Sequence, residues 1–359
     1  MRTVSLLSLL SLFLLFTGCD LTEDDSMTVV TSGVYIANGG AFGNANSSLT
    51  IFNPQTEALQ TLPPAGQAGF SSYIQSIEVG PRGRLFVVFG ETATVDIYDT
   101  PTNERIGQIT GIPNPRYVAV NGDRAYVTSQ DYGVDPSDVD VVDLTTSTVV
   151  DSVDVPGTPE DVEVLGSTIV VALGGFGSGS SIGIIDANDL TVQTIDIGCT
   201  GPRSLVRDED DEVIVFCTGI QTGNPSTSSP GAIRVVDPST GSISDEVELT
   251  TQISSASFGQ HVSYSSAAEE AYALLADGRV LRYDTATNQI ESRLDVAGDS
   301  PGAVGYDDRN ELLYIGRLSP ASPFDESGTV TVHERGGAAV DTIQAGVAPA
   351  HIDFSINAR

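Results

Sequence analysis

The chain has 359 residues, with 48 acidic and 16 basic side chains, and its formal net charge is −32. Every base is arginine, and so strong an excess of acids excludes binding to nucleic acid or to anionic lipid headgroups through charge. Charged residues make up 18% and hydrophobic residues 40%, which excludes a disordered polyanion and leaves enough apolar side chains for a core.

Residues 1–18 have the pattern of a signal peptide. Arg2 precedes an apolar run, 6–16, that is too short to span a bilayer, and Cys19 follows small residues. The sequence Leu-Phe-Thr-Gly-Cys at 15–19 resembles a bacterial lipoprotein box, which implies that Cys19 becomes the first mature residue and carries lipid. The alternative is a plain secretory signal followed by an incidental cysteine.

Residues 19–32 are expected to form a flexible acidic tether, because their acids come without an apolar period. Acids just after Cys19 also resemble the surface-export signals of Bacteroidetes-type lipoproteins. That resemblance implies a location on the cell surface at the outer membrane; otherwise the chain is periplasmic or secreted. The excess of acids and the absence of lysine resemble proteins of halophilic bacteria, and the alternative explanation is solubility through self-repulsion.

A repeat of four short β-segments organises residues 33–357. Its clearest segment ends in an acid or asparagine and recurs at Asn53, Asp99, Asp143, Asp186, Asp237, Asp284 and Glu334. The segments are rich in Val, Ile, Tyr and Thr, and turn residues separate them. Seven such repeats predict an all-β, seven-bladed β-propeller with four antiparallel strands per blade. A parallel β-helix, the alternative, uses shorter and stricter repeats.

The order of the segments also predicts how the ring closes. The first segment, 33–38, is of the second type within a repeat, whereas the last, 350–356, is of the innermost type. One blade is therefore expected to combine three N-terminal strands with an inner strand from the C-terminus. This pairing removes the open edges that a linear array would leave.

The repeats share a sequence pattern that can be compared with known proteins. In one repeat it reads Pro-Arg-Tyr-Val-Ala-Val at 115–120, Val-Asp-Val-Val-Asp at 139–143 and Val-Asp-Val-Pro at 153–156. It resembles the YncE-like bacterial surface β-propeller lipoproteins over most of residues 33–357, and it specifies fold better than function. Some members capture cobalamin for an outer-membrane transporter, so the resemblance implies nutrient capture for a TonB-dependent transporter as one role.

The strand order assigns the connections to two faces. One face has tight turns that contain the recurrent acids, which are expected to cap their own turns; the alternative is an array that binds Ca²⁺ or exchanges protons. The other face has long loops, at 38–48, 63–72, 129–138, 174–181, 218–232, 251–259 and 317–328. Any ligand is expected on this second face, around the mouth of the central channel.

Polar residues at the entry to the innermost strands are expected to ring this mouth and to bind the ligand. They are Gln75, Arg116, Glu160, Asp161, Arg203, Gln260, His261 and His351. The arginines could donate to an acidic or amide-bearing ligand, or else pair with neighbouring acids and close the channel. The two histidines lie two blades apart, so no metal site is predicted. No catalytic residue and no particular cofactor is predicted, because the known catalytic motifs are missing.

Cys199 and Cys217 are predicted to form a disulfide, since export permits oxidation. Counting back from the turn near 209–210 places Cys217 opposite Pro202, within about three residues of Cys199 in register. The alternative is a pair of buried thiols.

The function expected from these features is non-enzymatic, extracellular and lipid-anchored. The chain would bind a small molecule or a surface protein, and it would reach the membrane through its lipid anchor only. The alternatives are a lactonase-like or other metal-dependent hydrolase on a propeller scaffold, and a structural surface-layer component.

Overall fold

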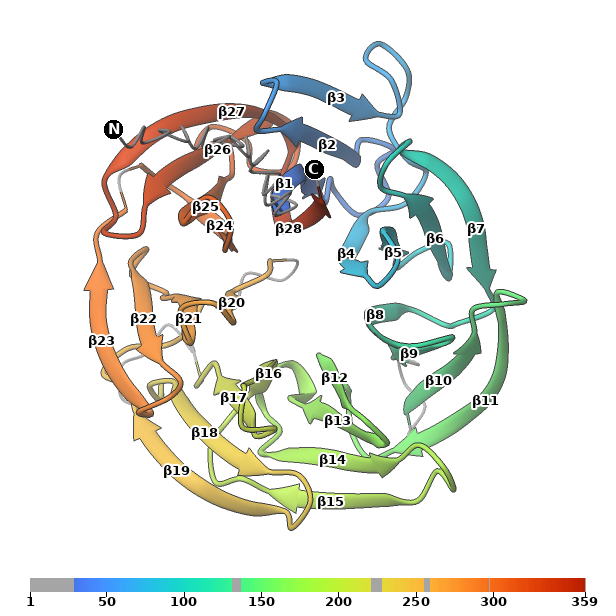
Figure 1. Cartoon of the computed structure of the whole chain (residues 1–359), viewed down its shortest axis with the longest axis vertical. Coiled ribbons are helices and arrows are strands. Elements are labelled where there is room, and N and C mark those ends of the chain that lie inside the picture. Colours follow the sequence, from blue (N-terminus) through green and yellow to red (C-terminus); the bar gives the residue numbers. More distant parts are fainter. Residues whose placement is uncertain (1–28, 131–136, 221–227, 255–258, 297, 359) are drawn as a thin grey trace, which may run out of the picture.

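A computed structural model describes residues 29–130, 137–220, 228–254, 259–296 and 298–358. Seven four-stranded antiparallel sheets stand like blades around a central channel (Figure 1), which confirms the predicted seven-bladed β-propeller. The helical structure in the described residues is limited to one 3₁₀ turn, η1 (Gly175–Gly177). No helix in this part of the chain is long and apolar enough to cross a membrane. The predicted signal peptide and Cys19 lie outside the described residues.

Within each blade the strands run from the channel to the outer edge. The closing blade contains β28 (Pro349–Ala358), β1 (Val29–Asn38), β2 (Ser48–Asn53) and β3 (Ala58–Leu62). The next two contain β4 (Ile74–Gly80), β5 (Arg84–Phe89), β6 (Thr94–Asp99) and β7 (Glu104–Thr110), and then β8 (Pro115–Asn121), β9 (Arg124–Ser129), β10 (Ser137–Asp143) and β11 (Thr148–Val155).

The other four blades follow in chain order. Two contain β12 (Val162–Leu165), β13 (Thr168–Leu173), β14 (Ser181–Asp186) and β15 (Val192–Asp196), and then β16 (Pro202–Arg207), β17 (Val213–Cys217), β18 (Ala232–Asp237) and β19 (Ser242–Glu248). The last two contain β20 (Val262–Ser265), β21 (Glu270–Leu274), β22 (Val280–Asp284) and β23 (Gln289–Leu294), and then β24 (Pro301–Asp307), β25 (Leu312–Arg317), β26 (Ser327–Glu334) and β27 (Ala339–Val347).

Strand β17 shows why the middle strands are apolar without a polar alternation. Its residues Val213 and Val215 pack in the cluster shared with the preceding blade, whereas Ile214 and Phe216 pack in the cluster shared with the following blade. Successive side chains of a strand point to opposite faces of the sheet, and in a propeller both faces are covered by neighbours. The core is therefore a series of apolar layers between blades.

The ring closes as predicted, through antiparallel pairing of β28 with β1. The register runs from Val29 opposite Ala358 to Asn38 opposite Pro349. Strand β1 begins at Val29, so residues 29–32, which the sequence assigned to the tether, belong to the sheet. Thr31 is fully buried there and its hydroxyl donates to Asp307 at 2.5 Å. Strand β1 begins before its apolar pattern because these first residues pair with β28, from the other end of the chain.

The recurrent acids cap their own turns. Carboxylate oxygens of Asp99, Asp143, Asp186, Asp237 and Asp284 accept backbone N–H groups two or three residues ahead, at 2.7–3.2 Å. Hydrogen bonds from Thr145 lower the pKa of Asp143, and hydrogen bonds from Ser239 and Thr240 lower that of Asp237. This agrees with the structural interpretation of the acids, because each one is used within its own turn.

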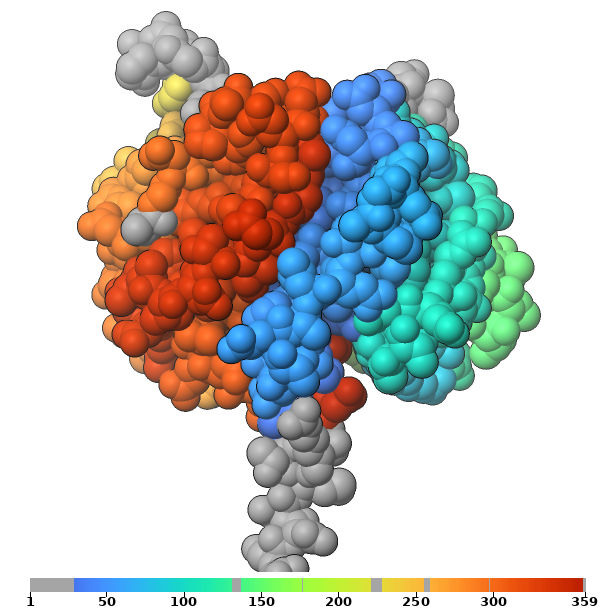
Figure 2. Space-filling model, turned by 90° about the horizontal axis from the view of Figure 1, so that it is seen from above, coloured from blue at the N-terminus to red at the C-terminus, as the bar shows by residue number. Residues whose placement is uncertain are grey.

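The two faces differ as expected. The start of β1 and the end of β28 both lie at the tight-turn face. Long segments on the opposite, loop-rich face include 39–47, 63–73, 218–231 and 318–326, although 90–93 and 275–279 are short. At the lower edge of Figure 2 the blue start of β1 lies beside the red end of β28, in agreement with their pairing. A segment that precedes Val29 therefore joins the molecule at the tight-turn face.

We predict that β28 is essential for stability. Ile352 is 1% exposed in the layer between β28 and β24–β27, so Ile352→Ala should lower the free energy of unfolding by about 2–4 kcal/mol in urea titrations. Ile356 lies on the same strand and is exposed, so Ile356→Ala should change it by less than about 0.5 kcal/mol. Equal effects of the two substitutions would contradict a closure held by buried contacts of β28.

Candidate functional site

The central channel contains a cavity of about 460 Å³ lined by the inner strands. Alternate residues of these strands face it, since side chains of a strand point in turn to opposite sides. Toward the loop-rich face the lining includes Ser76, Tyr117, Asp161, Ser204 and His351. Two residues farther along each strand it includes Glu78, Ala119, Glu163, Val206 and Asp353. The channel is thus polar, with carboxyl groups at two levels.

The predicted ring of polar residues is divided between the cavity and the protein interior. Asp161, Gln260 and His351 line the cavity, and Arg203 is half-buried. The remaining four are buried, with at most 6% of each residue exposed; they are Gln75, Arg116, Glu160 and His261. His351 is itself only 2% exposed although it lines the cavity, so Asp161 and Gln260 are the predicted residues most open to a ligand that enters the channel.

Arg116 links three inner strands. Its guanidinium donates to Gln75 Oε1 on β4 at 3.2 Å and forms an ion pair with the carboxylate of Glu160, just before β12. This is the pairing with a neighbouring acid that the sequence left open as the alternative to ligand binding. Removing the arginine would leave Glu160 buried without its ion-pair partner, which is costly. Arg116 therefore braces adjacent blades.

Other ring residues supply hydrogen bonds between inner strands. The carboxylate of Asp161 accepts the N–H groups of Val162 and Leu205, both at 2.9 Å, and so joins β12 to β16. Gln260 Oε1 accepts the N–H of Ile352 at 2.9 Å and joins β20 to β28. Inner strands of different blades are not paired in a sheet, so these side chains satisfy backbone groups of the inner strands.

The sequence reasoning missed three channel carboxyl groups, those of Glu78, Glu163 and Asp353. Burial, with repulsion from Asp161, raises the pKa of Glu163 to about 8. Burial raises the pKa of Asp161 to about 7 and that of Asp353 to about 6, and it raises the pKa of Glu78 well above its ordinary value. The channel therefore exchanges protons near neutral pH. A spacing of two residues from Asp161 and His351 could have identified Glu163 and Asp353 in the sequence, whereas Glu78 lies three residues after Gln75, beyond the register shift between Ile74 and Ser76.

The surroundings of His261 hold it as a neutral imidazole. His261 is 1% exposed, and its burial, with repulsion from Arg203 and His351, holds its pKa well below the ordinary range. Within the residues that the structure describes, no group of three His, Cys, Asp or Glu side chains could hold a metal ion. The described residues therefore offer no cluster of ligands for a metal-dependent reaction.

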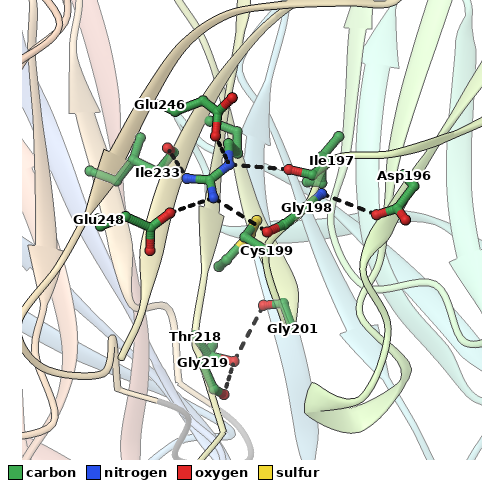
Figure 3. The surroundings of a disulfide bond; sticks show 12 residues. Asp196, Ile197, Gly198, Cys199, Gly201, Thr218, Gly219, Ile233, Glu246 and Glu248 are labelled. Atoms are coloured by element: carbon green, nitrogen blue, oxygen red, sulfur yellow. Dashed lines mark hydrogen bonds and ion pairs between the residues drawn. A yellow bond between two sulfur atoms is a disulfide. The ribbon is translucent and has the colours of Figure 1, made fainter. Parts of the chain in front are cut away.

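A disulfide joins Cys199 to Cys217, the pair that the sequence singled out, with 6.1 Å between the Cα atoms. Pro202 lies opposite Cys217 in the β16–β17 register. Figure 3 shows the surroundings of the bond, with Cys199 and Ile197 labelled. The buried guanidinium of Arg234 donates to the carbonyls of Ile197 at 3.1 Å and Ile233 at 3.0 Å. The same guanidinium pairs with Glu248 at 2.5 Å. The start of the long segment 218–231 is thus fixed to the corner before β16.

We predict that unreduced protein contains no thiol that can be alkylated at Cys199 or Cys217. Both residues should be labelled only after denaturation and reduction, as peptide mass spectrometry would show. Reduction should lower the free energy of unfolding by about 3 kcal/mol, because the bond closes a loop with a sequence separation of 18 residues. Labelling of both cysteines in freshly isolated, unreduced protein would contradict the bond.

We also predict that the channel carboxyls lower stability as the pH rises. Glu163 keeps its proton to about pH 8 in the folded chain and loses it near its ordinary 4.5 when unfolded, so the folded state loses stability between these values. Glu163→Gln should leave the melting temperature unchanged near pH 4 and raise it by about 2–4 °C near pH 9. Glu104→Gln, on exposed β7, is the control and should show no such gain. A gain that is independent of pH would argue against the mechanism.

Neither a family model nor a curated protein matches the chain. Among solved structures, the chain is similar to Kuenenia stuttgartiensis hydrazine synthase, with 16% identity, a TM-score of 0.64 and coverage of 80% of this chain and 95% of that chain. It is also similar to a chain of the mitotic checkpoint complex, with 12% identity, a TM-score of 0.61 and coverage of 87% and 96% respectively. At such identities the likeness shows the β-propeller fold alone.

Proposed function

We propose that the protein is a non-enzymatic binding protein, a YncE-like lipoprotein held outside the cell at the outer membrane by Cys19. The proposal rests on the lipoprotein-like sequence at 15–19 and on the YncE-like repeats, and the position of the chain ends is compatible with it. Val29 pairs with Ala358 at the tight-turn face, so a tether from Cys19 would join the propeller there. Ten extended residues reach about 35 Å. An anchor at Cys19 would turn the tight-turn face toward the membrane and the loop-rich face away from it.

The loop-rich face has features suited to contact with a ligand or a partner. Phe42 is 74% exposed in the segment 39–47, and Phe324 is 38% exposed in the segment 318–326. The side-chain amide of Asn46 donates to the backbone oxygen of Phe324 at 2.9 Å and links the two segments. Long loops on a rigid scaffold are common binding elements, and exposed aromatic side chains supply contact area. We propose that a small molecule or a surface protein binds this face.

The finer proposal is capture of a cobalamin-like nutrient for a TonB-dependent transporter. It rests on the YncE-like pattern of the repeats, such as the segments at 115–120 and 139–143. A position on the outer surface suits this role, because the loop-rich face would then meet both the nutrient and the transporter. Retention in the periplasm, or secretion, would leave the binding face intact and remove the transporter as its partner.

A second candidate function, hydrolysis on the propeller scaffold, is favoured by the channel carboxyls. Burial raises the pKa of Asp161 to about 7, which suits a general acid or base at neutral pH. However, a metal-dependent, lactonase-like enzyme needs several ligands around one ion, and the described residues contain no such group. Elemental analysis of the purified protein separates the two candidates, since a stoichiometric divalent metal would favour the hydrolase.

We predict that Cys19→Ser releases the protein from the membrane fraction into the soluble fraction, because the anchor is lost. Ser26→Ala, in the same N-terminal segment, is the control and should leave the protein in the outer-membrane pellet. Sedimentation of the Cys19→Ser protein with membranes in detergent-free buffer would overturn the anchor. Protease treatment of intact cells then tests the location: a surface protein is degraded without permeabilisation, whereas a periplasmic one is protected.

A further inference from the structure

A second cavity lies outside the channel, at the outer rim of the loop-rich face between the closing blade and the blade of β24–β27. Its volume is about 490 Å³, within the usual range for small-molecule sites. One wall consists of residues from β2, β3 and the segment 63–69; the other consists of Ser327 and the end of β27. Figure 2 shows these walls side by side, in blue and red. We call this space the rim cavity.

The rim cavity is uncharged, although the chain carries 48 acids. None of the described residues that line it has an ionisable side chain. The polar lining consists of hydroxyl and amide groups, those of Asn46, Ser47, Ser48, Thr50, Thr61, Gln67, Ser327 and Gln344. The apolar lining includes Leu59, Pro63, Pro64 and Val347. With 18% of the whole chain charged, a neutral lining of this size stands out from the surface around it.

The floor of the cavity is rigid. The buried side-chain amide of Asn38 donates to Ser48 Oγ at 3.1 Å and to Thr50 Oγ1 at 2.9 Å, and its oxygen accepts the N–H of Gly346 at 2.9 Å. A Cβ atom at Gly346 would lie 2.5 Å from Ser48 Oγ, so a larger residue would not fit there. The contacts fix β27 against β1 and β2, and they hold the two walls in place before any ligand arrives.

Several polar groups of the walls remain available. In the described part of the chain no side-chain hydrogen bond is made by Thr61, Gln67, Ser327 or Gln344, and the last three are exposed. Ser48 and Thr50 accept from Asn38; the hydroxyl hydrogen of partly exposed Ser48 stays free to donate, whereas Thr50 is 2% exposed and belongs to the floor. The cavity thus offers donors and acceptors next to apolar surface, including Leu59, which is 50% exposed.

We propose that the rim cavity binds a neutral saccharide, either a free sugar or the end of a glycan chain. Hydroxyl and amide groups match the hydroxyls of a sugar, and the apolar residues match its C–H faces. An anionic ligand would be repelled by the net charge of −32, and a cation would find no counter-charge in the lining. The proposal goes beyond the lipid-anchored role and does not need the anchor, so the two can fail separately.

The test uses saturation-transfer difference NMR on the full chain with cellobiose and maltose. A glucuronic acid disaccharide and a glucosamine disaccharide serve as charged probes. Gln344→Ala and Thr61→Val should each weaken binding of a neutral sugar roughly fivefold, the value of one hydrogen bond. Ala68→Trp should abolish binding, because an exposed wall residue would then fill the cavity. Gln193→Ala and Thr194→Val, on exposed β15 of another blade, are the matched controls and should bind normally.

Three outcomes would overturn the proposal: no saturable binding of either neutral sugar, stronger binding of a charged probe, or neutral-sugar binding that survives Gln344→Ala, Thr61→Val and Ala68→Trp. Melting temperatures of the variants show that each one is folded. Co-sedimentation with insoluble cellulose and retention on amylose resin distinguish the two sources of the ligand. Retention of the wild type but not of Ala68→Trp indicates a glycan chain, whereas binding of the disaccharides alone indicates a free sugar.

Discussion

Packing between neighbouring blades is the constraint on which the rest of the structure depends. In β1, Val34 and Ile36 contact the blade of β24–β27, while Tyr35 and Ala37 contact the blade of β4–β7. A blade on its own would leave both of these surfaces in water, and a linear array would leave one at each end. Closure of the ring by β28 solves this problem, and it places the first and last strands of the chain side by side.

The packing between blades also determines where several of the arginines lie. Burying acids between blades is costly unless a cation or hydrogen-bond donor accompanies them. Although burial opposes ionisation, hydrogen bonds from Arg282, Arg335 and Tyr272 hold the pKa of Glu270 at about 2. Arg116 has a similar role beside Glu160. Of these braces, Arg116 is one of the two arginines that the sequence suggested as ligand donors.

The repeat was predictable from the sequence because it comes from local rules. A strand such as 233–236 that ends in an acid or asparagine recurs in each blade, and this residue caps its turn in six of them. Turn chemistry and β-propensity act over a few residues. The accessibility of Arg116 was not predictable, because it depends on how β8 packs between β4 and β12. The alternation along β12 could have placed Glu163 at the channel, but its raised pKa depends on burial among strands of other blades. The rim cavity joins segments near residues 45–69 and 344–347, which no local pattern connects.

The channel cavity and the rim cavity therefore have different chemistry. The channel holds carboxyl groups that exchange protons near neutral pH, whereas the rim cavity has an uncharged lining that pH does not alter. The tight-turn face has acids whose pKa is lowered by their turn hydrogen bonds, such as Asp143 and Asp237, so it stays negative. A negative face repels anionic headgroups. If Cys19 is the anchor, this repulsion would keep the propeller at a distance from the lipid, and the loop-rich face would remain free to meet its ligands.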